Sequence, residues 1–150
     1  MFGFTAKITK TRMCIAVLCI ILVFVGIFVC CYHDEGQKPE LDAGTREKRV
    51  AFLQSYNWQV DADSEQVKTI TIPNEFDNVY TAYNSIQKAQ GFDLYDYKGK
   101  QVCLYTLKIN NYPNDSRYVF ASLLVCENKI IGGDIHSTEL SGFMHGFALD

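Results

Sequence analysis

The sequence predicts an α+β domain that follows a single N-terminal membrane-spanning helix, with the domain elements in the order helix, strand, helix and three strands. Three observations predict this arrangement. Residues 13–32 form an uncharged apolar run. Two segments with apolar residues at helical spacing flank a β-branched segment. Three β-rich segments separated by turn residues then close the chain. We expect the two helices to pack on one face of an antiparallel sheet.

The apolar run has the sequence MCIAVLCIILVFVGIFVCCY and contains no Pro. At ~1.5 Å of rise per residue, a helix over residues 13–32 spans roughly 30 Å, the thickness of the hydrocarbon core of a bilayer. A cleaved secretory signal has a shorter apolar core and small residues before the cleavage site, whereas Phe28 and Val29 are bulky. We therefore expect an uncleaved signal-anchor that partners the lipid bilayer through residues 13–32.

This span divides the chain into a tail at 1–12, the anchor at 13–32, a linker at 33–44 and a domain at 45–150. The charges of the tail are all positive, whereas the 17 Asp and Glu of the chain all follow the span. Positive charge marks the cytoplasmic flank of a span, so we expect a single-pass protein of the cell membrane with an extracytoplasmic domain. An acidic domain is unsuited to nucleic acid.

The linker is polar and lacks periodicity, and Thr45 after it can cap a first helix that extends to Tyr56. Val50 and Leu53 are its expected inward residues, and Trp58 is an expected core residue. Residues 61–65, DADSE, indicate a loop. The following QVKTITIP is rich in β-branched residues, which predicts a strand that ends at Pro73.

The second helix begins after Asn74 or Asp77 and ends at Gly91. Its apolar residues recur at helical spacing, which predicts that they belong to the core. These residues are Phe76, Val79, Tyr80, Tyr83 and Ile86.

The three strands are predicted at 101–111, 117–126 and 129–136, with a two-residue hairpin turn at Glu127 and Asn128. Pro113 suits the second position of a type I turn. A four-residue loop at 113–116 places Cys103 opposite Cys126, where antiparallel geometry allows a disulfide. Two reduced, buried thiols are the alternative.

The chain lacks paired CxxC motifs, a Walker loop and a G-x-S-x-G motif, so we expect no cofactor and no enzymatic activity. Gly132 and Gly133 indicate a bulge or a close approach of another segment. The sheet face opposite the expected core face carries Lys108, Asp134 and His136, and His145 follows shortly after. These four residues are the candidate binding surface, with a metal site or acid–base cluster as the alternative to an open sheet face.

Short motifs in a fixed order carry a family resemblance across about residues 48–147. They are Arg49, Phe52-Leu53, Trp58-Gln59-Val60, Ile72-Pro73, Tyr83-Asn84, Gln87, Gln90-Gly91-Phe92-Asp93-Leu94, Tyr97-Lys98-Gly99-Lys100, Asn111-Tyr112-Pro113, Ile131-Gly132-Gly133-Asp134 and Gly142-Phe143-Met144-His145-Gly146. In these motifs the chain resembles a Firmicutes family, domain of unknown function 4830. The resemblance implies a bacterial protein, often membrane-anchored or exported, and transfers no catalytic residues.

We expect an extracytoplasmic, non-enzymatic module that binds another envelope protein or a peptide. Two alternatives remain. One is a small metal-dependent or acid–base enzyme that uses Asp134, His136 and His145. The other is a structural subunit of a membrane complex.

Overall fold

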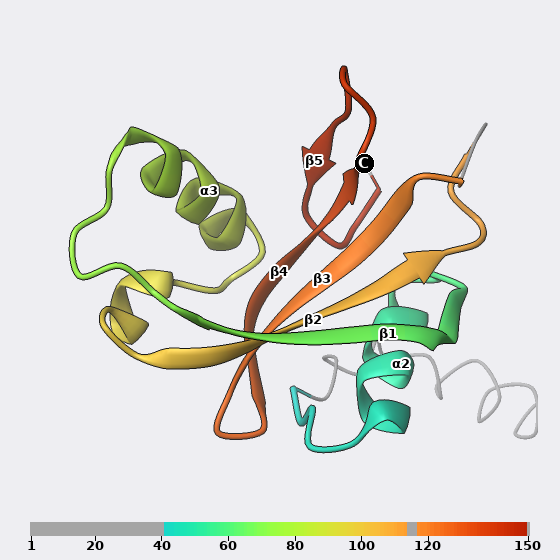
Figure 1. The fold of residues 1–150 in the computed structure, drawn as a ribbon, viewed down its shortest axis with the longest axis horizontal. Helices are drawn as coiled ribbons and strands as arrows, with labels where there is room; N and C mark the ends of the chain where they lie inside the picture. The colour runs from blue at the N-terminus through green and yellow to red at the C-terminus, as the bar shows by residue number, and fades with distance from the viewer. Residues whose placement is uncertain (1–40, 114–116, 150) are drawn as a thin grey trace, which may run out of the picture. The chain divides into compact units, whose positions relative to one another are not determined.

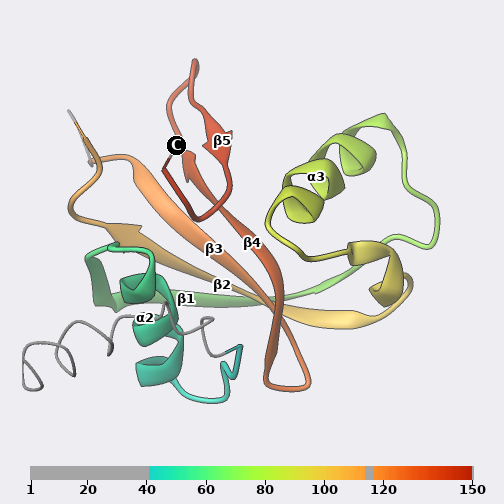
Figure 2. The ribbon, with the colours of Figure 1, turned by 180° about the vertical axis from the view of Figure 1, so that it is seen from behind.

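A five-stranded antiparallel sheet forms the centre of the domain, as seen from two sides in Figures 1 and 2. The computed structural model describes residues 41–113 and 117–149. Neighbouring strands of the sheet follow each other in the chain, so the sheet is a meander. The elements are α2 (Arg46–Ser55), β1 (Val60–Thr71), α3 (Asn78–Ala89), the 3-10 helix η1 (Leu94–Tyr97), β2 (Gln101–Ile109), β3 (Val119–Cys126), β4 (Lys129–Ser137) and β5 (Met144–His145). The predicted α+β class is confirmed.

The predicted anchor at 13–32 lies outside the described residues, as do the tail and most of the linker. Within residues 41–113 and 117–149, no helix is both long and apolar enough to cross a membrane. The end of the predicted linker is ordered beside the β3–β4 turn, where Asp42 bridges Lys129 and Ala43 is buried.

The two helices lie on opposite faces of the sheet, so the prediction of both on one face is wrong. The first face packs against Phe52 and Leu53 of α2 and against Phe147. The second face packs against Leu94 of η1 and Tyr83 of α3. The physical reason lies in β3, where every position except one is buried. A strand that is apolar at successive positions has both of its faces covered.

The register between β2 and β3 differs by one residue from the predicted register, which was wrong. Cys103 lies opposite Val125, and both Cys103 and Cys126 are free thiols. Cys103 packs with the first face and Cys126 with the second, so their side chains point away from each other. Of the two alternatives, the structure therefore has two free thiols and not the disulfide. The strands separate at Ile109 because Asn110 and Asn111 instead bond to Gln59, so the turn at Pro113 does not set the register.

The hairpin between β3 and β4 confirms the predicted two-residue turn. Glu127 and Asn128 have φ angles of 50° and 63°. Positive φ at both central residues is the type I′ geometry that matches the twist of paired strands.

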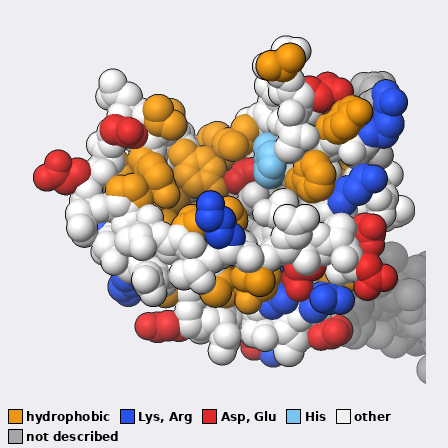
Figure 3. Space-filling model, in the orientation of Figure 1, with side chains coloured by type: hydrophobic (Ala, Val, Ile, Leu, Met, Phe, Trp, Pro, Cys, Tyr) orange, Lys and Arg blue, Asp and Glu red, His pale blue; other side chains and the backbone are white. Residues whose placement is uncertain are grey.

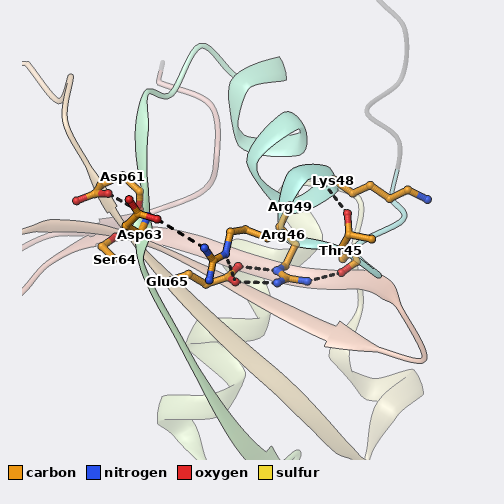
Figure 4. A network of polar contacts seen from close by, with 9 residues as sticks. Thr45, Arg46, Lys48, Arg49, Asp61, Asp63, Ser64 and Glu65 are labelled. Carbon is orange, nitrogen blue, oxygen red and sulfur yellow. Dashed lines mark hydrogen bonds and ion pairs between the residues drawn. The ribbon is translucent and has the colours of Figure 1, made fainter.

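The segment predicted as a loop at 61–65 is instead part of β1. Asp61 pairs with Lys108 and Gln66 with Thr106, so β1 bulges at residues 62–65 between these pairs. The Ser64 hydroxyl accepts the Lys108 N–H at 2.8 Å. The bulge therefore keeps this backbone group satisfied and directs Glu65 toward α2, as Figure 4 shows.

A buried ion pair joins α2 to this bulge. The Arg49 Nε and Nη2 atoms donate to the two Glu65 carboxylate oxygens at 2.7 and 2.8 Å, and Nη1 donates to the Ala43 carbonyl at 2.7 Å. The guanidinium also lies 3.8 Å from the ring centroid of Tyr105. The hydrogen bond from Arg49 lowers the pKa of Glu65. Each of the three guanidinium nitrogen atoms of Arg49 thus donates a hydrogen bond, and the bidentate contact with Glu65 makes this pair a specific clamp.

Candidate binding groove

A groove of about 510 Å³ lies between α3 and the second face of the sheet. We call it the α3 groove. Figure 3 shows the hollow, with apolar side chains along it and a His side chain beside an acidic one at its inner end. Its lining is mostly apolar and consists of Ile70, Val79, Tyr80, Ala82, Tyr83, Ile86, Leu104, Ser122, Leu124, Asp134, His136 and Met144.

The C-terminal half of α3 is fixed to β4 by two glutamine side chains. Gln87 accepts the Gly133 N–H at 2.8 Å, and Gln90 donates to the Gly133 carbonyl at 3.1 Å. A Cβ atom on Gly132 would lie 2.7 Å from the Gln87 Oε1 atom, so any other residue here would push the Gln87 side chain out of its present position. The predicted close approach at the Gly-Gly pair is therefore confirmed, and β4 also has a register shift beside it.

The prediction of the apolar stripe as core is confirmed in part. Phe76, Tyr80 and Tyr83 pack against the second face, whereas the stripe also lines the groove from Val79 to Ile86. The only fully buried side chains of α3 are Asn84 and Gln87. Asn84 accepts the Leu94 N–H at 2.8 Å and donates to Asp93 at 2.9 Å, which fixes η1 beside α3. Because these polar contacts hold the helix, its apolar side faces the groove, and Val79 is 75% exposed.

Asp134 is the buried polar centre of the groove, with 3% of its surface exposed. Its two carboxylate oxygens accept the Tyr83 hydroxyl at 2.8 Å and contact the His136 Nδ1 atom at 2.7 Å. Burial, together with the nearby Asp134 charge, raises the pKa of Tyr83, so its hydroxyl stays protonated. With Nδ1 bonded to Asp134, the His136 Nε2 atom has no hydrogen-bond partner among the described residues.

Polarity changes in steps along the strands on the second face. Residues of β2, β3 and β4 that pair with each other form rows across the sheet. Three such rows lie one after another on this face. The first row is apolar, the second is polar, and the third is basic and aromatic. The rows are Leu104, Leu124 and Gly132; Thr106, Ser122 and Asp134; and Lys108, Phe120 and His136. The groove therefore has an apolar end and a polar end.

The structure brings together three of the four predicted site residues. Asp134, His136 and Lys108 share the second face, whereas His145 pairs with Ile135 and lies on the first face. There the His145 Nε2 atom lies 3.2 Å from the Tyr112 hydroxyl. The expected cluster with His145 does not form. Within residues 41–113 and 117–149, no group of three His, Cys, Asp or Glu side chains could hold a metal ion.

Sequence reasoning missed the role of Tyr83 and the existence of the groove. One signal was available, because Asn84, Gln87 and Gly91 recur at helical spacing beside the apolar stripe. Polar residues at such positions can fix a helix to a backbone and leave its apolar stripe exposed.

A sequence model of a family described as a domain of unknown function (DUF4830) matches residues 52–135. This match includes α3, the Gly-Gly pair and Asp134. A search of curated proteins and a search of solved structures each gave no match to the chain.

Proposed function

Because this chain belongs to the DUF4830 family, described only as a domain of unknown function, we propose its function from the α3 groove. The protein is a non-enzymatic module that binds an apolar ligand or peptide at the bacterial cell envelope. Its anchor at residues 13–32 holds it in the cell membrane, with the domain on the extracytoplasmic side.

The groove itself is the observation that carries this proposal. Its volume of about 510 Å³ lies within the range of small-molecule sites, and such sites are mostly apolar with a few placed polar groups. Val79 and Met144 line the groove and are 75% and 49% exposed, so part of its apolar lining lies in water. Covering that surface with a ligand would be favourable.

A bulky side chain at Ala82 tests the binding role. We expect Ala82→Trp to weaken binding of the neutral dye Nile red at least tenfold, because Ala82 lines the groove and the indole would occupy it. The measurement is dye fluorescence with the full-length chain in phosphatidylcholine nanodiscs.

Ala89→Trp is the matched control, since Ala89 is exposed on the same helix and does not line the groove. Dye that partitions into lipid contributes equally to the fluorescence of both variants, so the difference in fluorescence between them reports dye bound in the groove. Equal dye binding by both variants and the wild type would refute the groove as a binding site.

The proposed topology predicts which positions react with a membrane-impermeant maleimide on intact cells. We expect Leu140→Cys to be labelled, because Leu140 is fully exposed on the domain, and Thr5→Cys in the tail to be labelled only after permeabilisation. Each is compared with the unsubstituted chain to subtract native cysteines. The reverse pattern would place the domain in the cytoplasm.

The contact between Asp134 and His136 favours one alternative, an acid–base enzyme. A carboxylate that holds a His Nδ1 atom leaves Nε2 available as a general base, which contributes typically 10²–10⁴-fold to a rate. Hydrolysis of p-nitrophenyl laurate distinguishes the two functions. An enzyme releases p-nitrophenolate and loses this activity in His136→Ala, whereas a binding module gives the same slow release in both.

A further inference from the structure

We propose that the α3 groove binds a single-chain amphiphile with an anionic head, of the long-chain fatty acid class. Its alkyl chain lies between α3 and the row of Leu104 and Leu124, and its carboxylate lies near Lys108 and His136. This inference rests on the proposed binding function and specifies its ligand.

An alkyl chain suits the groove better than a peptide does. An extended peptide carries an N–H and a C=O at every residue, and burying each without a partner costs about 1–3 kcal/mol. The groove offers few free partners, because the Asp134 oxygens already bind Tyr83 and His136. An alkyl chain has no polar groups along its length and leaves none unsatisfied.

The dimensions of the groove favour one chain. Its lining extends from Ile70 on β1 to Met144 on β5, and strands lie ~4.8 Å apart, so the groove crosses roughly 19 Å of sheet. Its volume of about 510 Å³ is in the lower half of the range for ligand sites, about 300–1,000 Å³. A free, single-chain ligand therefore fits better than a two-chain membrane lipid.

Lys108 in the third row supplies the positive charge that selects an anionic head. Lys108 and His136 are the two basic residues of this row, and both flank Phe120. Asp61 lies opposite Lys108 across β1 and β2, and its carboxylate accepts the Asp63 N–H at 3.0 Å and forms no ion pair with Lys108. No described acidic side chain forms an ion pair with Lys108. Lys108 therefore offers a positive charge without an ion-pair partner among the described side chains, in the same row as His136, which lines the groove.

Equilibrium dialysis of radiolabelled laurate tests the inference. The full-length chain is held in phosphatidylcholine nanodiscs, empty nanodiscs give the blank, and all ligands stay below the concentration of micelle formation. We expect laurate to displace Nile red and to bind more tightly than decanoate, by about fourfold per methylene, which corresponds to ~0.8 kcal/mol. Dodecanol, which has the same chain without the charge, should bind more weakly than laurate.

Lys108→Gln tests the position of the head. We expect it to weaken laurate binding about fivefold, the upper range for a partly exposed ion pair, and to leave dodecanol unchanged. Lys68→Gln is the matched control, because Lys68 shares this face but lies opposite Leu104 in the apolar row. Equal effects of both substitutions would overturn the assigned head position.

Three results separate failure of the ligand class from failure of the binding function. If Nile red binds in the groove but laurate does not displace it, the fatty acid class is wrong and the binding function stands. Displacement of Nile red by an apolar peptide, without displacement by laurate, would assign the groove to peptides. If Ala82→Trp changes neither dye nor laurate binding, both proposals fail.

Discussion

Glu65→Ala lowers the free energy of unfolding by about 3–5 kcal/mol, the cost of removing one partner from a buried ion pair. Arg49 is 6% exposed, and both carboxylate oxygens of Glu65 bind it. The substitution leaves a buried guanidinium without its counter-charge. The measurement is urea unfolding of the full-length chain, followed by the fluorescence of Trp58, the only Trp in the sequence.

The pH dependence of this loss in the free energy of unfolding identifies its electrostatic origin. The pKa of Glu65 is lowered in the folded state, mainly by Arg49, so its stabilisation is present above the pKa of the unfolded state. It is lost as the pH falls through the lower pKa of the folded state. The difference between wild type and Glu65→Ala should therefore shrink below about pH 4.3.

Asp63→Ala is the control for this prediction, because Asp63 also contacts an arginine, Arg46, but its side chain is 99% exposed. Exposed ion pairs contribute about 0–1 kcal/mol. A loss of the same small size in Glu65→Ala would show that the pair does not hold α2 to the bulge of β1.

Gly133→Ala destabilises the domain by about 3 kcal/mol or more, at the upper end of the cost of overpacking. A Cβ atom at this position would lie 2.1 Å from the Ser122 carbonyl oxygen and 2.5 Å from Phe147 Cζ. The first contact is to backbone of the neighbouring strand, which cannot move without breaking the pairing of β3 and β4. The same urea titration measures the effect.

Gly91→Ala is the matched control for the glycine substitution. Gly91 has a φ angle of +85° at the end of α3, but nothing lies within 4 Å of its added Cβ. We expect only the conformational cost of a left-handed residue, about 1–2 kcal/mol. If both alanine variants are equally stable, close approach at Gly133 is not what holds β4 beside Phe147.

Features that depend on neighbours in the chain could be predicted from the sequence. Thr45 caps α2 and Asp77 caps α3, because a side-chain oxygen close to the first turn satisfies its free N–H groups. The type I′ turn at Asn128 and the end of α3 at Gly91 likewise follow from backbone conformations that few residues adopt. Each of these contacts is local, so a short stretch of sequence contains all of its determinants.

The candidate site depended on pairings across the sheet. Lys108, Asp134 and His136 could be placed on one face because alternation along a strand is a local property. Tyr83 could not be joined to Asp134, because that contact depends on how α3 crosses the sheet. His145 was placed with the wrong residues, because β5 pairs with β4 in a register that puts it on the first face.

The sequence by itself determined the family, the order of the two α-helices and the first four strands, the caps of the helices and the tight turn between β3 and β4. Only the tertiary structure decided which face each helix covers, the register of Cys103 and the existence of the α3 groove. The physical reason is that β3 is apolar on both sides, so its pattern cannot tell which helix packs on which face. The groove exists because Gln87 and Gln90 fix α3 to the Gly-Gly backbone of β4, and such a long-range contact leaves no periodic signal in the chain.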